Sequence, residues 1–534
     1  MRGKFCLPAL LLALLVGLCG CAGFLEREIT LDTAGLENIS PRDGYRTFYE
    51  IFVGAFSDSD GDGMGDLQGV INRLDYLNDG DPASGKSLGV SGLWLMPVFP
   101  AGSYHKYDVW NYTDIDSDYG TLEDMDALLA ACHERDIAVI VDLVLNHTSS
   151  YHPWFKAAKK AVQEGDMENP YAAYYSIGTT EKAGWYPLAV DPKGVQYYYE
   201  GNFSPEMPEL NMDTPALLEE IRNIAAFWLE RGVDGFRLDA VKYVYLNDDA
   251  RNIAFWQWFA GMCREINPEV ILVGEDWSDD SHILSYYKAI DCFDFGMAGS
   301  GGEPALTLNA VYTVNQYAVY LERYTAKITD AREGAIPRPF LSNHDMDRSA
   351  GYASVKGKEK AAANLYLLSP GSPFLYYGEE IGMLGSRGNA NTDANRRLAM
   401  LWGDGDKVQD PVGSTYPASR QVNGTAAAQV RRKDSLYNHY KKLLLLRGAY
   451  PEIARGSLTA LELPGYDLAG GWVCTWQGRR VAVVQNIGEE TLTLSLETMG
   501  LSGATLGGFA GGSARLEGDS LTLAGQTAAV LPIP

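Results

Sequence analysis

An arginine and an aspartate two residues apart, Arg237 and Asp239, are the first candidates for chemistry in this sequence. They follow a short apolar segment that begins at Gly235 and has the pattern of a buried strand. Residues i and i+2 of a strand lie on the same face, so the two side chains would point the same way. The guanidinium would lower the pKa of the carboxyl group and keep it ionised. Such a carboxylate suits nucleophilic attack on a glycosidic carbon; the alternative is a structural ion pair.

Three other apolar segments also end in polar residues. Their ends are Asp142-Leu143-Val144-Leu145-Asn146-His147, Gly274-Glu275-Asp276-Trp277 and Ser342-Asn343-His344-Asp345. Each acid alone is compatible with a helix cap or a salt bridge. Together, however, the four segment ends would bring three carboxylates (Asp239, Glu275 and Asp345) and two imidazoles (His147 and His344) to one site if the segments are neighbouring parallel strands.

The segments that must position these residues alternate between strands and helices. The predicted strands are 46–56, 89–99, 136–147, 233–241, 270–276, 291–297, 337–345 and 372–382. The predicted helices are 67–79, 121–135, 214–232, 250–267, 278–289, 308–328, 356–369 and 434–447. Eight strand–helix pairs with nearly continuous apolar strands predict an α/β fold, the parallel (β/α)8 or TIM barrel, whose functional residues lie at the C-terminal ends of the strands.

Long connections and a change of pattern divide the chain further. Residues 148–213 follow the third predicted strand and are rich in aromatic residues, which predicts an inserted domain B. From 455 to 534 the pattern changes to short strands with Gly and Thr, which predicts a separate C-terminal all-β sandwich domain. The barrel would comprise residues 44–147 and 214–454.

The N-terminus has the features of a targeting segment. A basic start precedes an apolar run, 5–19, that is short for a membrane span, and Leu18-Cys19-Gly20-Cys21 resembles a bacterial lipoprotein cleavage box. We predict a lipoprotein signal peptide at 1–21, a lipid anchor on Cys21 and a tether at 22–43. The protein would then be extracellular and anchored to the surface of a bacterial membrane. The alternative is ordinary signal cleavage, which gives a secreted soluble protein.

Charge and cysteine content narrow the class of protein. The chain has 534 residues, 46% of them hydrophobic, and a formal net charge of −25. This charge disfavours binding to nucleic acid or to anionic membrane surfaces. We expect a monomer that contacts a membrane only through its lipid anchor. Four scattered cysteines are predicted to be buried small hydrophobic residues rather than disulfide or zinc ligands: Cys132, Cys263, Cys292 and Cys474.

An acidic loop, 58–66, is a candidate site for a hard cation. Its carboxylates and one backbone carbonyl have the spacing of the first ligands of an EF-hand calcium loop. The predicted ligands are Asp58, Asp60, Asp62, Met64 and Asp66. The twelfth position is Gly69, so the bidentate glutamate of an EF-hand is missing. The alternative is an acidic turn without an ion.

The strand-end motifs, in their order and on their predicted strands, resemble the α-amylase family, glycoside hydrolase family 13. The resemblance covers roughly residues 45–534 and includes three further motifs. These are Gly89-Val90-Ser91-Gly92-Leu93-Trp94-Leu95-Met96-Pro97, Tyr104-His105-Lys106-Tyr107-Asp108 and Met207-Pro208-Glu209-Leu210-Asn211. The last motif looks intermediate between the oligo-1,6-glucosidase and neopullulanase types. As a whole, the chain resembles lipoprotein α-amylases of that intermediate kind.

The resemblance implies a retaining attack on an α-glucosidic bond. Asp239 would be the nucleophile, Glu275 the general acid/base and Asp345 the stabiliser of the transition state. The substrate-binding residues that it implies are Tyr107, Asp108, His147, Arg237, Lys242, His344 and Arg397. Arg397 would pair with Asp108, with Arg396 as the alternative partner. The pKa of Glu275 must be raised by neighbouring carboxylates and partial burial for it to act as an acid.

The resemblance also bears on specificity. Ala240 directly after the nucleophile, followed by Val241 and Lys242, is similar to amylases that act on α-1,4 bonds. We therefore expect endo-hydrolysis of α-1,4-glucans such as starch and maltodextrins. The alternatives are a neopullulanase, α-glucosidase or transglycosylase of the same family, and a non-catalytic glucan-binding protein.

The resemblance implies structural Ca²⁺ in the acidic loop, as in oligo-1,6-glucosidase-like members of the family. A second calcium site, found near the insert in many α-amylases, has weaker support. Asn146 is present, but Glu209 stands in place of the usual aspartate and Tyr243 in place of the usual histidine.

Overall fold

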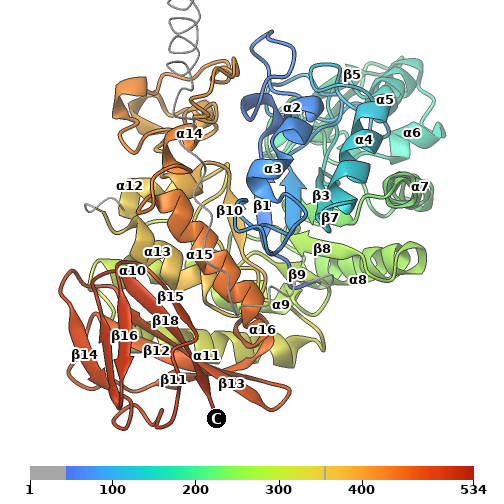
Figure 1. Ribbon diagram of the computed structural model, residues 1–534. Helices are drawn as coiled ribbons and strands as arrows, with labels where there is room; N and C mark the ends of the chain where they lie inside the picture. The colour runs from blue at the N-terminus through green and yellow to red at the C-terminus, as the bar shows by residue number, and fades with distance from the viewer. Residues whose placement is uncertain (1–43, 354–356) are drawn as a thin grey trace, which may run out of the picture.

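The computed structural model describes residues 44–353 and 357–534 (Figure 1). The predictions for the signal peptide, Cys21 and the tether fall on residues 1–43 and lie outside the described residues. A buried parallel sheet has the strand order β10-β1-β2-β3-β7-β8-β9. Its strands are β1 (Phe48–Ile51), β2 (Gly92–Leu95), β3 (Ala138–Leu143), β7 (Gly235–Leu238), β8 (Ile271–Gly274), β9 (Asp291–Cys292) and β10 (Phe374–Tyr376). Seven of the eight predicted strands are therefore present, in the predicted order along the chain.

The remaining predicted strand, 337–345, closes the barrel without forming a ladder. Arg338 makes a single parallel bridge to Phe293 beyond β9, and Phe340 makes one to Phe374 of β10. Pro337 and Pro339 have no backbone N–H, so they cannot donate ladder hydrogen bonds. Their carbonyls still accept hydrogen bonds, for example from Phe374 N–H to the Pro339 oxygen at 2.9 Å. The segment 338–340 thus completes the (β/α)8 barrel as an irregular seam.

Helices surround the sheet, and each of the eight predicted helices has a counterpart among them. They are α2 (Leu67–Asn72), α3 (Leu74–Leu77), α4 (Leu122–His133), α7 (Pro215–Arg231), α8 (Asp249–Ile266), α9 (Asp280–Tyr286), α10 (Glu303–Leu308), α11 (Val314–Ala331), α12 (Ser349–Ala353), α13 (Glu359–Leu367), α14 (Ala426–Gln429), α15 (Leu436–Ala449) and α16 (Pro451–Arg455). Of these, α10, α12, α14 and α16 are additional to the predicted helices. Asp66 caps α2, and Thr121 begins α4 with a capping box. The predicted helix 67–79 is broken at Arg73, whose guanidinium binds Asp404 and Asp406.

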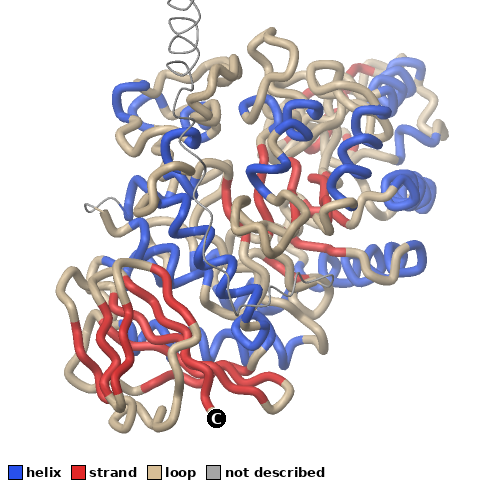
Figure 2. The backbone as a smooth tube through the Cα atoms, viewed as in Figure 1, coloured by secondary structure: helices blue, strands red, loops and turns tan. Residues whose placement is uncertain are grey.

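Two further groups of antiparallel strands lie outside the barrel, one in the insert and one at the C-terminus (Figure 2). Between β3 and α7, helices α5 (Pro153–Glu164) and α6 (Pro170–Ala173) accompany a three-stranded antiparallel sheet of β4 (Ile177–Gly178), β6 (Gln196–Glu200) and β5 (Trp185–Val190). The C-terminal strands are β11 (Ser457–Leu461), β12 (Ala469–Trp476), β13 (Arg479–Asn486), β14 (Leu492–Ser495), β15 (Gly508–Ala510), β16 (Ala514–Glu517), β17 (Ser520–Leu523) and β18 (Thr527–Ile533). They form a five-stranded and a three-stranded antiparallel sheet with a shared apolar core.

The cysteines Cys132, Cys263, Cys292 and Cys474 are all buried, which confirms their predicted burial, and none of them forms a disulfide. Within residues 44–353 and 357–534, no helix combines the length and the hydrophobicity that crossing a bilayer requires.

Candidate active site

Arg237 lies at the centre of a carboxylate cluster at the C-terminal ends of three adjacent strands. Its fully buried guanidinium contacts Asp142 Oδ1 and Asp239 Oδ1 through Nη1, both at 2.8 Å. Its Nη2 lies 2.6 Å from Glu275 Oε2. Asp142 belongs to β3, Asp239 follows β7 and Glu275 follows β8, so the parallel barrel brings the three acids together. The predicted contact between Arg237 and Asp239 is confirmed, whereas the role of Asp142 in this cluster had not been foreseen.

Glu275 has the properties of a group that exchanges protons near neutral pH. Burial raises its pKa to about 7, the carboxylates of Asp239 and Asp345 add to the rise, and Arg237 opposes it. The backbone N–H of Ala240 also points at Glu275 Oε2, at 3.4 Å. Ala240 has a φ of +44°, a left-handed conformation that an alanine rarely adopts and that costs about 1–3 kcal/mol. Backbone strain is thus placed directly after the predicted nucleophile.

Asp345 lies on the opposite side of the site, in the loop after the seam. Its carboxylate is 47% exposed, binds Arg397 Nη2 at 2.6 Å and faces His344 Nε2 at 3.1 Å. Partial burial tends to raise its pKa, but the charges of His344 and Arg397 outweigh this and hold the pKa well below its usual range. A cavity of about 600 Å³ opens beside Asp345, within the range of about 300–1,000 Å³ typical of ligand sites. An ionised carboxylate therefore faces a space large enough for a ligand.

His344 is buried between two acids. Its Nδ1 lies 2.6 Å from Glu50 Oε1, and its Nε2 faces Asp345 and the Tyr107 hydroxyl, the latter at 2.7 Å. Burial lowers the pKa of the imidazole, but Asp345 and Glu50 more than offset this and raise it to about 10. His344 is therefore a cation at neutral pH. Glu50, at the C-terminal end of β1, had not been foreseen as a site residue.

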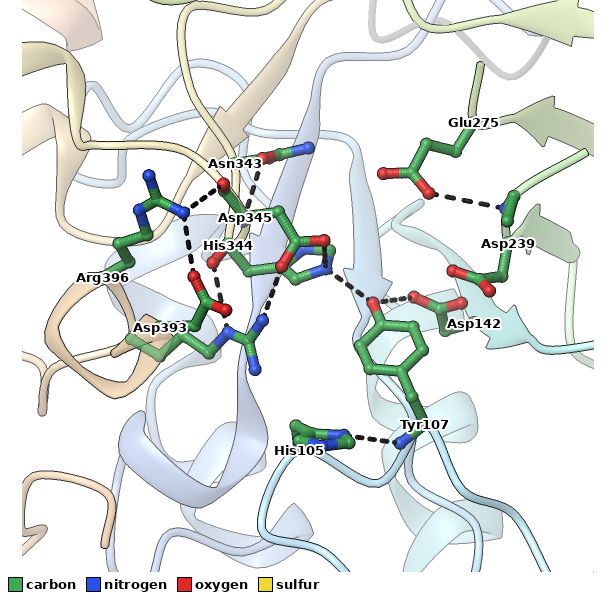
Figure 3. Close-up of polar contacts among 12 residues, drawn as sticks. His105, Tyr107, Asp142, Asp239, Glu275, Asn343, His344, Asp345, Asp393 and Arg396 are labelled. Carbon is green, nitrogen blue, oxygen red and sulfur yellow. Dashed lines mark hydrogen bonds and ion pairs between the residues drawn. The ribbon is translucent and has the colours of Figure 1, made fainter. Parts of the chain in front are cut away.

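Tyr107 connects the two halves of the site (Figure 3). Its hydroxyl donates to Asp142 Oδ2 at 3.0 Å, and its ring stacks on His344 with centroids 5.5 Å apart. The Tyr107 carbonyl faces His147 Nε2 at 3.3 Å. His147 Nδ1 is buried without a partner, and burial lowers the pKa of this imidazole. His147 is therefore neutral and has one ring nitrogen left for a ligand.

The predicted pair between Arg397 and Asp108 is wrong. Arg397 binds Asp345, and the carboxylate of Asp108 is taken up by its own loop: two backbone N–H groups, at 3.0 and 3.1 Å, and the Ser103 hydroxyl. The Asp108 carboxylate is therefore hydrogen-bonded within its own loop and does not pair with a distant arginine. The alternative partner, Arg396, also points elsewhere, because its Nη1 donates to the Asp345 carbonyl at 2.7 Å.

An aromatic row beyond Glu275 was missed by sequence reasoning. Trp277, 40% exposed, stacks on Tyr243 with ring centroids 5.5 Å apart, and Phe203 lies 5.2 Å from Tyr243. Lys242, predicted to bind substrate, places its Nζ 4.3 Å from the centroid of the Trp277 ring. The signal in the sequence was a tryptophan two residues after a strand-end glutamate.

The acidic loop gathers some of its predicted ligands. Carboxylate oxygens of Asp58, Asp60 and Asp66 lie within 4.8 Å of one another, whereas Asp62 is not part of this group. Backbone N–H groups in the loop fold back onto the carboxylates, as from Gly63 to Asp58 Oδ2 at 2.8 Å. The donor set of hard oxygens fits a calcium ion.

The residues of the doubtful second calcium site do not form a comparable cluster. Asn146 Nδ2 donates to the Asp239 carbonyl at 2.7 Å, and its Oδ1 is buried without a partner. Glu209 is buried and its pKa is raised well above the usual range, mainly by burial. Over residues 44–353 and 357–534, the acidic loop is the one place where ligand atoms of three acids, histidines or cysteines all lie within 4.8 Å of one another.

Comparison with known proteins places this site in a family. The model of the α-amylase catalytic domain matches residues 50–456. This chain belongs to the α-amylase family of glycoside hydrolases. Among relatives, α-amylase 3 of Dictyoglomus thermophilum is 38% identical over 449 residues, which are 82% of this chain and 84% of that protein. The solved structure of Amy13B from Eubacterium rectale has a TM-score of 0.86 and 35% identity, and the match covers 94% of this chain and 98% of that one.

Relatives within the α-amylase family differ in their named activities. A 4-α-glucanotransferase of Thermotoga neapolitana is 30% identical over 410 residues, which are 74% of this chain and 85% of that protein. Family membership therefore makes this chain a glycoside hydrolase of the α-amylase family with an α-glucan substrate, and leaves open whether it favours hydrolysis or transfer.

Proposed function

We propose that the protein is an α-amylase that hydrolyses internal α-1,4-glucosidic bonds of starch and maltodextrins with retention of configuration. The observation that carries this proposal is the binding of Asp239 and Glu275 to one guanidinium, that of Arg237. Sharing one cation favours the separation of about 5–5.5 Å that a retaining glycosidase uses over the wider gap of about 6.5–9.5 Å in inverting enzymes.

In this mechanism the two acids divide the chemistry. Asp239 attacks the anomeric carbon, and the Glu275 proton passes to the departing glycosidic oxygen, which leaves a glycosyl ester on Asp239. Glu275, now a carboxylate, takes a proton from water as the water cleaves that ester and restores both groups. Asp345, held ionised by His344 and Arg397, stabilises the positive charge that develops on the sugar.

The preference for internal α-1,4 bonds is supported by the segment Ala240-Val241-Lys242 and by the named activity of the α-amylase from Dictyoglomus thermophilum. The test is the product profile on maltoheptaose and on pullulan, with the anomeric form of the first product read by NMR. Early mixed products of intermediate length from maltoheptaose, in the α-form, are expected. Release of glucose alone would contradict endo-cleavage, and a β-configured first product would contradict retention.

Transglycosylation is the second candidate activity, and the aromatic row supports it. Trp277 follows the proposed acid/base Glu275 by two residues and stacks on Tyr243, and such aromatic faces could hold an acceptor sugar. A relative named 4-α-glucanotransferase shares 30% of the aligned residues. Incubation with maltotriose at high concentration tests this candidate, because transfer yields products longer than the substrate and hydrolysis does not.

A structural calcium ion in the acidic loop is part of the proposal. The carboxylates of Asp58, Asp60 and Asp66 converge, and no basic side chain of the described part of the chain forms an ion pair with them. The ion would neutralise this cluster and fix the loop ahead of α2. Elemental analysis of the purified protein, with a chelator-treated sample as control, tests the assignment.

The proposed location is the surface of a bacterial membrane, through lipid attached to Cys21. The support is the sequence Leu18-Cys19-Gly20-Cys21 and the apolar run before it. In a bacterial host, the Cys21→Ala protein is expected in the medium and the unchanged protein in the membrane fraction. Absence of any lipid label on the unchanged protein would refute the anchor.

A further inference from the structure

We propose that a surface groove beside the catalytic mouth, formed around Trp110 and Tyr151, is a second binding site for the α-glucan chain. This inference rests on the proposed function and extends it, because the groove would hold the polymer without taking part in bond cleavage. The groove has a volume of about 680 Å³. None of its residues belongs to the cluster around Arg237 or to the His344–Asp345 pair.

Two large aromatic side chains from separate segments meet at the surface in this groove. Trp110 is 39% exposed and Tyr151 is 58% exposed. Their ring centroids lie 6.4 Å apart and the rings are inclined at 82°. Single exposed aromatic residues are ordinary on protein surfaces, but two that form a corner over a groove provide faces on which sugar rings can stack.

Beneath this corner the aromatic packing is firm. Trp154 stacks on the buried Tyr112 with centroids 6.3 Å apart, and the Tyr112 hydroxyl donates to the carbonyls of Val144 and His147, both at 2.9 Å. A platform that is anchored to the end of β3 loses little conformational entropy on binding, which favours a preformed site.

The rest of the groove is polar and of mixed charge. Its polar lining residues are Asn111, Thr113, His152, Lys156 and Glu220. The side-chain Oδ1 of Asn111 accepts hydrogen bonds from the Thr113 backbone N–H, at 3.1 Å, and from the Thr113 hydroxyl, at 3.2 Å. The amide nitrogen of Asn111, the ammonium of Lys156 and the carboxylate of Glu220 provide donors and acceptors for hydroxyl groups. Aromatic faces combined with both signs of charge suit a neutral, hydroxyl-rich ligand, whereas the net charge of −25 disfavours an acidic one.

One short segment of the chain runs from the active site to the groove. Trp110 follows Tyr107 of the active site by three residues, and between them Val109 forms a bridge to Ala101. The Ser149 N–H donates to the Val109 carbonyl at 2.8 Å, which fixes the segment of Tyr151 to that of Trp110. A chain of several glucose units bound in the groove would therefore remain close to the cleft, and this continuity favours the enzyme's own substrate as the occupant.

The test compares a long and a short substrate in the double variant Trp110→Ala/Tyr151→Ala. Affinity electrophoresis in gels with amylopectin, in an Asp239→Ala background, reports binding without turnover. We expect about tenfold weaker retardation from the loss of two stacking faces. With the intact nucleophile, kcat/KM on amylopectin should fall several-fold, while kcat/KM on maltotriose stays within twofold. Tyr466→Ala, a similarly exposed tyrosine of the C-terminal domain, is the matched control.

Each other outcome overturns the inference. Unchanged retardation in amylopectin gels, with the melting temperature preserved, means that the groove does not bind glucan. An equal loss of kcat/KM on maltotriose assigns the two residues to the catalytic cleft. A dimer of the unchanged protein that the double variant dissociates, measured by sedimentation, assigns the groove to a protein interface. If the double variant unfolds, Trp110→Gln and Tyr151→Gln singly must each weaken retardation or the inference fails. These outcomes can be distinguished from a failure of the proposed function, since the wild-type enzyme would then be inactive on both amylopectin and maltotriose.

Discussion

Two clusters of three carboxylates in this protein differ in how the repulsion between their like charges is reduced. Around Arg237 the acids are almost fully buried, with side-chain exposures of 0% for Asp142, 10% for Asp239 and 6% for Glu275. Burying charges is tolerated only when they are paired, so the guanidinium is part of the cluster. In the acidic loop, Asp60 is exposed, Asp58 and Asp66 are half-buried, and all three carboxylates receive backbone N–H groups instead. The cation of the buried cluster is a side chain of the protein itself, whereas the cation that we propose for the acidic loop would come from solution.

The largest effect is expected from removing either acid of the buried cluster. Asp239→Ala should reduce turnover of every substrate to background, because no glycosyl ester can form. Glu275→Gln should lose about 10²–10⁴-fold on starch but much less of the first step on an α-glucosyl fluoride, whose leaving group needs little acid help. Mass spectrometry of quenched Glu275→Gln should find the adduct on Asp239. A label on another carboxylate would refute these roles.

Removing the shared cation should break the buried cluster as a whole. Arg237→Gln leaves three buried carboxylates without their partner, which costs about 3–5 kcal/mol in the free energy of unfolding. Activity should fall as well, since Asp239 would lose the contact with Arg237 that aligns its carboxylate. Denaturant unfolding and starch hydrolysis at one pH measure both effects. Arg231→Gln removes a surface pair with Asp126 and is the control, expected to change stability by less than about 1 kcal/mol. A similar, small effect of both changes would contradict the central role of Arg237.

The next effect concerns pH. The pKa of Glu275 is about 7, raised mainly by burial, so kcat/KM on starch should fall about tenfold per pH unit above 7 as the general acid loses its proton. The folded state holds this proton more tightly than the unfolded state does. The contribution of Glu275 to stability therefore falls as pH rises from its ordinary pKa of 4.5 to about 7. Melting temperatures of the unchanged protein and Glu275→Gln across this range should converge at low pH, and a flat activity profile to pH 9 would contradict the assignment.

The smallest effect should come from removing the proposed cation of the acidic loop. Chelation is expected to lower the melting temperature by several degrees, because ion binding stabilises the folded state. Asp60→Asn should lose most of this response, while Asp62→Asn should keep it, since Asp62 is not part of the close group. Thermal scans of both variants with and without chelator separate the two positions. If both variants lose the response equally, Asp62 is a ligand as well, as the EF-hand-like spacing predicts. If chelator does not change the melting temperature of the wild-type protein, the proposed ion is not bound.

The sequence was informative where local pattern decides structure. Strands buried on both faces appear as continuous apolar runs, so the barrel and the acids at its strand ends could be predicted. Contacts between side chains of loops that are distant in the sequence could not be predicted in this way. Arg397 binds Asp345 rather than Asp108 because the Asp108 loop satisfies its own carboxylate, a fact of loop geometry that spacing does not encode. Likewise Glu50 lies 294 residues from His344, and no periodicity links them.

The proline-interrupted seam at 338–340 has a consequence for how the enzyme fails in heat. Single bridges on either side give this part of the barrel wall less backbone bonding than a strand ladder provides. Segments with fewer such bonds open locally at a lower free energy than the whole domain, and they exchange their amide hydrogens earlier. The continuation of this segment carries His344 and Asp345, so opening there would displace Asp345, the proposed stabiliser of the transition state, while the remaining wall is still intact. Loss of activity on heating should therefore begin below the melting temperature. It should be reversible at first, because it results from local opening of the barrel wall and not from global unfolding.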